Sequence, residues 1–114
     1  MRDIKYKALY NKRIFDVISI SWRNGKIIKI LHRTLENINK ISKPSEVRLL
    51  QYTGIKDNTG VEIYEGDILF DEYSEECGTV NFDECKFNVV FGNVCEDLFE
   101  YADSCHIIGN TYEI

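Results

Sequence analysis

Acidic side chains on both sides of Gly66 are the residues of this sequence best suited to chemistry. Paired carboxylates can act as a general acid and base, or they can bind Mg²⁺ or Ca²⁺. Neither residues 65–67, Glu-Gly-Asp, nor residues 57–60, Asp-Asn-Thr-Gly, have the spacing of a calcium-binding loop. Glycine lets a backbone bend, and aspartate can bond exposed backbone groups there. We therefore interpret these residues as a structural turn motif, which comprises Gly54, Asp57, Gly60, Glu65, Gly66 and Asp67.

The four cysteines and two histidines of the chain give no clear metal site or nucleophile. Along the chain, Cys77, Cys85, Cys95 and Cys105 are 8, 10 and 10 residues apart, and no Cys-x-x-Cys pair occurs. A zinc site usually takes two ligands from one tight turn. No phosphate-binding loop, dinucleotide fingerprint or metalloprotease motif occurs either. We expect four free thiols, no metal, no cofactor and no catalytic residue, and thus a protein that is not an enzyme.

Positive and negative charges are divided between the two halves of the chain. Residues 1–56 contain 13 Lys and Arg against 4 Asp and Glu, a balance of +9. Residues 57–114 contain 1 against 15, a balance of −14, which gives the net charge of −5. A row of basic side chains with aromatic neighbours can hold a single-stranded nucleic acid. The candidate contacts are Lys5, Lys7, Arg13, Arg23 and Lys26. The alternative is that these side chains form the solvated face of amphipathic strands.

The elements that position these acidic and basic side chains are predicted to be mostly β-strands. Alternating polarity and runs of β-branched and aromatic residues predict strands over residues 4–10, 14–22, 27–32, 46–52, 61–64, 67–73, 78–82, 87–91 and 106–112. Asn24-Gly25 favours a tight hairpin turn, because both residues tolerate positive φ angles. Residues 33–46 could form a short helix or an irregular connector, since Leu35, Ile38 and Ile41 have helical spacing. Residues 96–102 could form one helical turn.

The predicted fold is mainly β, with one or two short helical segments. A chain of 114 residues with 44% hydrophobic and 12% aromatic residues fits one globular domain. We divide residues 1–114 into an N-terminal β-hairpin part, about 1–46, and a C-terminal part, about 47–114. From about residue 48 the order of expected elements is typical of a small SH3-like barrel. The hairpin part is expected to pack against that barrel.

Three blocks of the chain resemble one protein family. The opening MRDIKYKA is similar to the Met-Arg-Glu-Ile-Lys-Phe-Arg-Ala opening of the YopX family. LQYTGIKD, followed by EIYEGDI, resembles the most distinctive block of that family, and IGNTYE resembles its closing block. The blocks stand in the family's order, although Leu9-Tyr10 replaces a frequent Trp. The resemblance implies a phage or prophage protein that acts in the cytoplasm of its host bacterium, and it implies no mechanism.

The leading functional hypothesis is a small non-catalytic protein-interaction module that binds itself or a host protein. Exposed strand edges pair readily with other chains, and opposite charge on the two halves favours a head-to-tail homo-oligomer. No apolar run reaches the ~20 residues that cross a bilayer, and the charged N-terminus differs from a signal peptide. We therefore expect a cytoplasmic protein without membrane contact. Two alternatives stay open: single-stranded nucleic-acid binding through the basic half, and an acidic nucleic-acid mimic that blocks a host protein.

Overall fold

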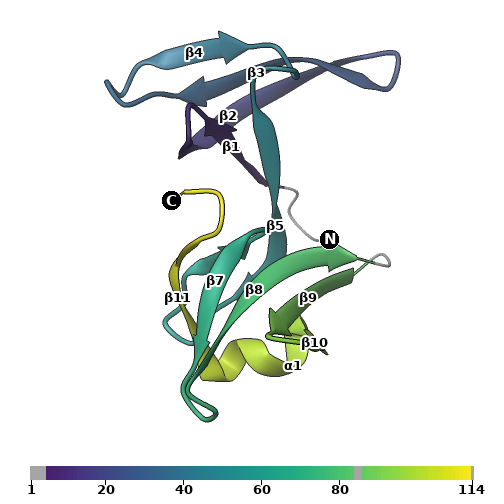
Figure 1. Cartoon of the computed structure of the whole chain (residues 1–114). Helices are drawn as coiled ribbons and strands as arrows, with labels where there is room; N and C mark the ends of the chain where they lie inside the picture. The colour runs from purple at the N-terminus through teal and green to yellow at the C-terminus, as the bar shows by residue number, and fades with distance from the viewer. Residues whose placement is uncertain (1–4, 84–85, 114) are drawn as a thin grey trace.

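Two antiparallel sheets and one short helix make up the part of the chain that the structure describes, residues 5–83 and 86–113 (Figure 1). The structure is a computed structural model. It confirms the prediction of a mainly β fold. No helix in the described residues is long and apolar enough to cross a membrane.

The first sheet has six strands in the order β4-β3-β2-β1-β5-β6. Its strands are β1 (Tyr6–Tyr10), β2 (Arg13–Arg23), β3 (Lys26–Arg33), β4 (Asn39–Ser42), β5 (Arg48–Lys56) and β6 (Glu62–Tyr64). The predicted tight hairpin joins β2 to β3, where Arg23 pairs with Lys26 and the intervening Asn24 and Gly25 have φ angles of 52° and 77°. Beyond Asp16, β2 is no longer paired with β1, and its remaining length pairs with β3 alone among the described strands.

The second sheet has five strands in the order β10-β9-β8-β7-β11. Its strands are β7 (Asp67–Asp71), β8 (Glu76–Asp83), β9 (Lys86–Phe91), β10 (Val94–Asp97) and β11 (Cys105–Asn110). The α-helix α1 (Leu98–Tyr101) and the 3-10 helix η1 (Ala102–Ser104) connect β10 to β11 and match the expected helical turn. The sheet follows the expected order of elements, but it does not close into a barrel, because β10 and β11 lie at its opposite edges.

Strand β5 joins the two halves of the molecule (Figure 1). Its first residues pair with β1, with Leu50 opposite Lys7, and its later residues pair with β6, with Tyr52 opposite Tyr64. Gly66 then connects β6 to β7. The Gly66 amide donates a hydrogen bond to the Val80 carbonyl (2.8 Å), and its own carbonyl accepts one from the Thr111 amide (2.8 Å). The turn after β6 is thereby bonded to the second sheet and to the C-terminal segment.

The hydrophobic core belongs mainly to the second sheet. Its buried cluster consists of Ile63, Leu69, Val80, Phe87, Val89, Phe91, Leu98, Ala102 and Cys105. The first sheet buries fewer apolar side chains, namely Ala8, Ile30, Leu50, Tyr52, Ile63 and Tyr64, together with polar ones that include His32 and Ser42. Apolar burial is the main favourable term in folding, so we expect the second sheet to contribute the larger share of the stability of the molecule.

Residues 33–46 form neither a helix nor an irregular connector, because β4 lies between two turns. The Asn37 amide donates to the Thr34 carbonyl (2.9 Å), and Asn37 has a φ angle of 58°, which reverses the chain after β3. The apolar residues with helical spacing, Leu35, Ile38 and Ile41, are all exposed, so that spacing does not mark a buried helix face. Two other predicted features, the start of the first strand at Ile4 and the thiol of Cys85, lie outside the described residues.

Gly60 and Gly66 of the turn motif allow a matched test of how tightly the turn between β6 and β7 is packed. Both have positive φ angles, +88° and +87°, so alanine is strained at either position, at about 1–2 kcal/mol. A Cβ at Gly60 meets nothing within 4 Å, whereas one at Gly66 comes within 2.6 Å of the Tyr112 ring. We expect Gly66→Ala to lower the free energy of unfolding by about 1–3 kcal/mol more than Gly60→Ala does, measured by urea denaturation. Equal losses would contradict the close packing of Tyr112 on Gly66.

Candidate functional site

The carboxylate of Asp57 binds two parts of the chain that lie far apart in sequence. Its Oδ1 accepts hydrogen bonds from the Thr59 amide (2.9 Å), the Thr59 hydroxyl (2.7 Å) and the Val61 amide (2.9 Å). Its Oδ2 accepts one from the Ile107 amide of β11 (3.0 Å). Burial by itself would raise the pKa of Asp57, but these hydrogen bonds outweigh it and hold the pKa below its ordinary value. The carboxylate therefore stays ionised while it fastens the β5–β6 loop to the last strand.

Asp67, which follows Gly66 directly, also accepts hydrogen bonds with both carboxylate oxygens. Its Oδ2 accepts a hydrogen bond from the Tyr64 amide (2.7 Å), and its Oδ1 accepts one from the Asn110 side-chain amide (2.9 Å). Burial raises the pKa of Asp67, against the lowering effect of these two bonds. Each of its oxygens is thus engaged within the turn.

The remaining candidate acids bond different partners rather than one another. Glu65 accepts from the Gln51 amide (3.3 Å), and Glu62 forms an ion pair with Lys5 (2.7 Å). Asp71 accepts from the Tyr73 amide (3.1 Å) and from the Ser74 hydroxyl (2.9 Å). Among the residues that the structure describes, no group of three or more His, Cys, Asp or Glu side chains could hold a metal ion. The acids around Gly66 have the contacts of a turn motif.

A histidine and a serine of the first sheet form a pair that resembles a nucleophile and its base. The Ser42 hydroxyl lies 2.8 Å from Nε2 of His32, and the Arg33 carbonyl lies 2.7 Å from Nδ1. A carbonyl can only accept, so Nδ1 donates to it, and Nε2 shares a hydrogen bond with the Ser42 hydroxyl. His32 is 0% exposed and Ser42 is 2% exposed, so no substrate could reach the pair. Its arrangement is suited to satisfying buried polar groups between β3 and β4.

The three cysteines that the structure describes are free thiols. Cys77 and Cys95 are exposed free thiols, and Cys105 is a buried one in the core of the second sheet. Burial raises the pKa of Cys105, which keeps its thiol protonated and unreactive.

The five basic residues predicted to contact nucleic acid lie in three separate places. Lys5 pairs with Glu62, and the Lys7 ammonium lies 4.6 Å from the centre of the Tyr64 ring, near the junction of the sheets. Arg23 and Lys26 face each other at the tip of the β2–β3 hairpin. Arg13 stands at the other end of the 11-residue strand β2. The structure does not bring these side chains into one continuous row.

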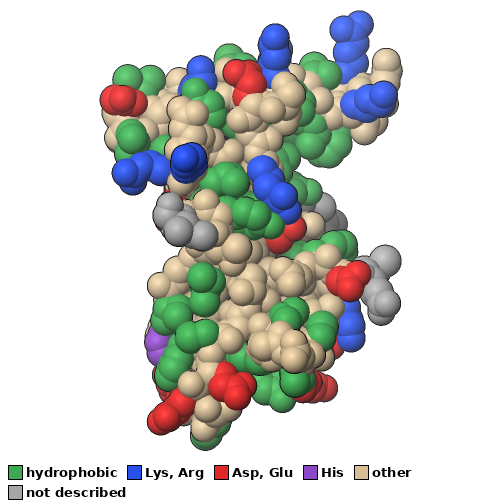
Figure 2. All heavy atoms as spheres, in the orientation of Figure 1, with side chains coloured by type: hydrophobic (Ala, Val, Ile, Leu, Met, Phe, Trp, Pro, Cys, Tyr) green, Lys and Arg blue, Asp and Glu red, His purple; other side chains and the backbone are tan. Residues whose placement is uncertain are grey.

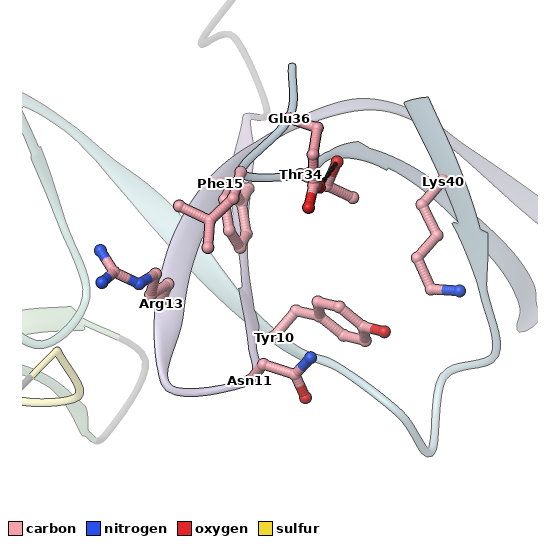
Figure 3. A pocket seen from close by; sticks show the side chains of 8 residues that line it. Tyr10, Asn11, Arg13, Phe15, Thr34, Glu36 and Lys40 are labelled. Atoms are coloured by element: carbon pink, nitrogen blue, oxygen red, sulfur yellow. Dashed lines mark hydrogen bonds between the residues drawn. The ribbon is translucent and has the colours of Figure 1, made fainter. Parts of the chain in front are cut away.

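A small open pocket in the first sheet, which we call the notch, combines aromatic and basic side chains (Figure 3). Its volume is ≈ 290 Å³, and its lining residues are Tyr10, Asn11, Arg13, Phe15, Thr34, Leu35, Glu36 and Lys40. Tyr10 and Phe15 both contact the ring of the buried His32, with ring centres 5.1 and 6.3 Å away. The Lys40 ammonium lies 5.7 Å from the centre of the Tyr10 ring. The notch thus offers an apolar floor with two cations beside it, which suits an acidic or aromatic group.

A second, larger hollow, which we call the groove, lies along the unpaired edge of β2. Its volume is ≈ 670 Å³, and it is lined by Lys5, Tyr6, Asp16, Val17, Ile18, Ser19, Ile20, Trp22 and Tyr64. Burial and the nearby Glu62 carboxylate raise the pKa of Tyr64 to about 12, so its hydroxyl stays protonated at neutral pH. The groove is mostly apolar, and it lies beside a strand edge that pairs with no described strand beyond Asp16.

Sequence reasoning missed both hollows. The notch combines the β1–β2 turn with the segment after β3, which the helical interpretation of residues 33–46 concealed. A usable signal was present, because large apolar residues at 35, 38 and 41 in a segment rich in turn residues are unusual unless they contact something.

Comparisons with known proteins identify relatives of the chain. A family model described as YopX protein matches residues 5–114. The crystal structure of protein EF1440 from Enterococcus faecalis is similar in fold, with a TM-score of 0.67 over 99% of this chain and 96% of that one. The two sequences are 24% identical, so this likeness concerns the fold alone. No curated protein matches the chain.

The lowered pKa of Asp57 predicts how the stability of the fold depends on pH. The folded-state pKa lies below the ordinary value of 3.8, so the carboxylate stabilises the fold above that pH. This stabilisation is lost as the pH falls through the folded-state pKa. We expect Asp57→Asn to reduce the free energy of unfolding at pH 7 by about 1–3 kcal/mol and to make it fall less steeply in acid. Urea denaturation between pH 7 and pH 2 measures both effects, and an unchanged acid dependence would contradict the assignment.

Proposed function

The chain belongs to the YopX protein family, and on that premise we propose that it is a small non-catalytic protein-interaction module. We place its contact surface on the first sheet, with the notch and the groove as its two recesses. In line with the resemblance described above, the proposal includes a phage or prophage origin and action in the cytoplasm of a host bacterium.

The observation that supports this proposal most is the exposure of apolar side chains on the first sheet. Half of the large hydrophobic side chains exposed in the described residues lie between positions 18 and 41, namely Ile18, Trp22, Ile28, Leu35, Ile38 and Ile41. An apolar surface of this kind, mixed with polar residues, is typical of a protein contact site. Trp22 is the strongest single example, since it is 57% exposed and tryptophan is enriched among residues that dominate binding energy.

The backbone of the first sheet offers a second feature for binding. From Ile18 to Trp22, one edge of β2 pairs with no other described strand. An extended segment of a partner can add a strand to such an edge, with main-chain hydrogen bonds for affinity and side-chain pockets for specificity. The outer strand β4 is short and carries Lys40, which is a common protection of an edge against unwanted pairing. The length of β2 beyond Asp16, which pairs with β3 alone among the described strands, is therefore the better edge for a partner.

The non-catalytic part of the proposal rests on the contacts of the candidate chemical groups. The carboxylates of Asp57, Asp67 and Asp71 accept hydrogen bonds from backbone amides, and the pair of His32 and Ser42 is enclosed. Groups engaged in this way have little capacity left for a substrate.

A capture experiment tests the proposed contact surface. The full chain is immobilised and exposed to a nuclease-treated lysate of a natural host bacterium. We expect a protein partner to be retained, and Trp22→Ser to reduce its retention by about tenfold or more, as for a central contact residue. Tyr73→Ser is the matched control, because Tyr73 is an even more exposed aromatic residue, at 89%, in the turn between β7 and β8.

Two results would contradict the proposal. One is capture that nuclease abolishes and that charge reversal at Arg23 and Lys26 removes, which would favour single-stranded nucleic-acid binding. The other is equal retention of a partner by wild type and Trp22→Ser, which would place the contact elsewhere.

A further inference from the structure

The basic and acidic side chains of the protein are separated in space as well as in sequence. In Figure 2 the Lys and Arg side chains gather mainly over the first sheet, and the Asp and Glu side chains mainly over the second. The molecule is elongated, with principal extents of 42 × 31 × 25 Å, and the two sheets lie at opposite ends of it (Figure 1). Each end of one molecule is therefore complementary in charge to the other end of a second molecule.

The acidic end carries an exposed aromatic side chain on α1. Phe99 is 75% exposed, although its neighbours Leu98 and Ala102 are buried in the core. The Asp97 carboxylate caps α1 by accepting from the Phe99 amide (3.0 Å), which fixes the backbone from which the ring projects. Four acidic residues lie close to Phe99 in sequence: Glu96, Asp97, Glu100 and Asp103. Among the described residues, only Asp97 of these four forms an ion pair, with Lys86 (3.8 Å).

The basic end carries a recess of matching character, the notch. Tyr10 and Phe15 supply aromatic surface (Figure 3), and the exposed Leu35 also lines the notch. Lys40 extends toward this surface, whereas Arg13 stands at the rim of the notch with its guanidinium directed away from the rings (Figure 3). Within the described part of the chain neither forms an ion pair. Glu36 is the one acid in the lining. The notch can therefore accept an aromatic side chain that is flanked by carboxylates.

We propose that α1 of one molecule docks into the notch of a second copy of the same chain. Phe99 enters the notch between the rings and Leu35, and the acids around α1 face Arg13 and Lys40. This inference rests on the proposed function, because it uses the first sheet as the contact surface, and it names the partner as the chain itself.

Head-to-tail assembly follows from the positions of the two contact sites. The notch and α1 belong to opposite ends of the molecule, so the two molecules of a pair use different surfaces (Figure 1). Such a heterologous contact leaves one unused notch and one unused α1 in every dimer, and it continues into a ring or an open chain.

Sedimentation velocity over a range of protein concentrations tests this assembly. We expect the wild type to form species larger than a monomer in about 50 mM NaCl and to dissociate in about 500 mM NaCl, because the screening length becomes short. Lys40→Glu blocks the notch, and Phe99→Asp blocks α1. Each variant alone is expected to be monomeric, with association weakened about tenfold or more.

An equimolar mixture of the two variants gives the sharpest result. Lys40→Glu retains an intact α1, and Phe99→Asp retains an intact notch. The mixture should therefore form a 1:1 dimer and nothing larger, since the two sites left over are both blocked. A symmetric contact, in which both molecules use the same surface, could not be restored by mixing.

Two matched variants control for general effects of charge. Tyr73→Asp adds an acid at an exposed aromatic residue in the turn between β7 and β8, and Lys29→Glu reverses a charge on β3 outside the notch. Both should assemble like the wild type, and urea denaturation confirms that all four variants are folded. A wild type that stays monomeric in low salt, or a mixture that stays monomeric, would overturn the inference. The proposed function would then still be decided separately by capture of a host protein.

Discussion

Apolar burial is concentrated in the second sheet, and this distribution constrains the rest of the molecule. The second sheet buries its cluster around Leu69 and Val80 beneath α1, while the β2–β3 hairpin of the first sheet leaves Ile18, Trp22 and Ile28 exposed. Trp22, which is 57% exposed, therefore stays in contact with water in the single molecule. Folding therefore leaves the first sheet with the property that a binding surface needs, because contact with a partner can still remove apolar area from water.

The strands and the β2–β3 hairpin were predictable because their causes are local. Alternation of side chains determines which face is buried, and Asn24-Gly25 supplies both positive φ angles of the turn. Residues 33–46 were mispredicted because three apolar residues at helical spacing were taken for a buried helix face. A turn at Asn37 and the pairing of β3 with β4 override that pattern. The SH3-like barrel was inferred from the order of strands along the chain. That order does not determine whether the outer strands meet, and in the structure β10 and β11 lie at opposite edges of an open sheet.

The candidate sites depend on contacts between distant residues, which no local pattern reports. The turn motif was identified from glycines and acids, but the bond from Ile107 to Asp57 joins residues 50 positions apart. The notch likewise combines Arg13 with Lys40. The division of charge was visible in the sequence, whereas its placement at opposite ends of the molecule was not (Figure 2).

The long-range pairing of β7 with β11 has a consequence for the order in which the two sheets can form during synthesis. The first sheet is complete once residue 64 has been synthesised, because β6 is its last strand along the chain. The second sheet requires β11, and Asp57 receives its bond from Ile107 only when that strand is present. On the ribosome, where a chain emerges from its N-terminus, the sheet with the smaller core can pair first. The main core then waits until β11 has left the exit tunnel.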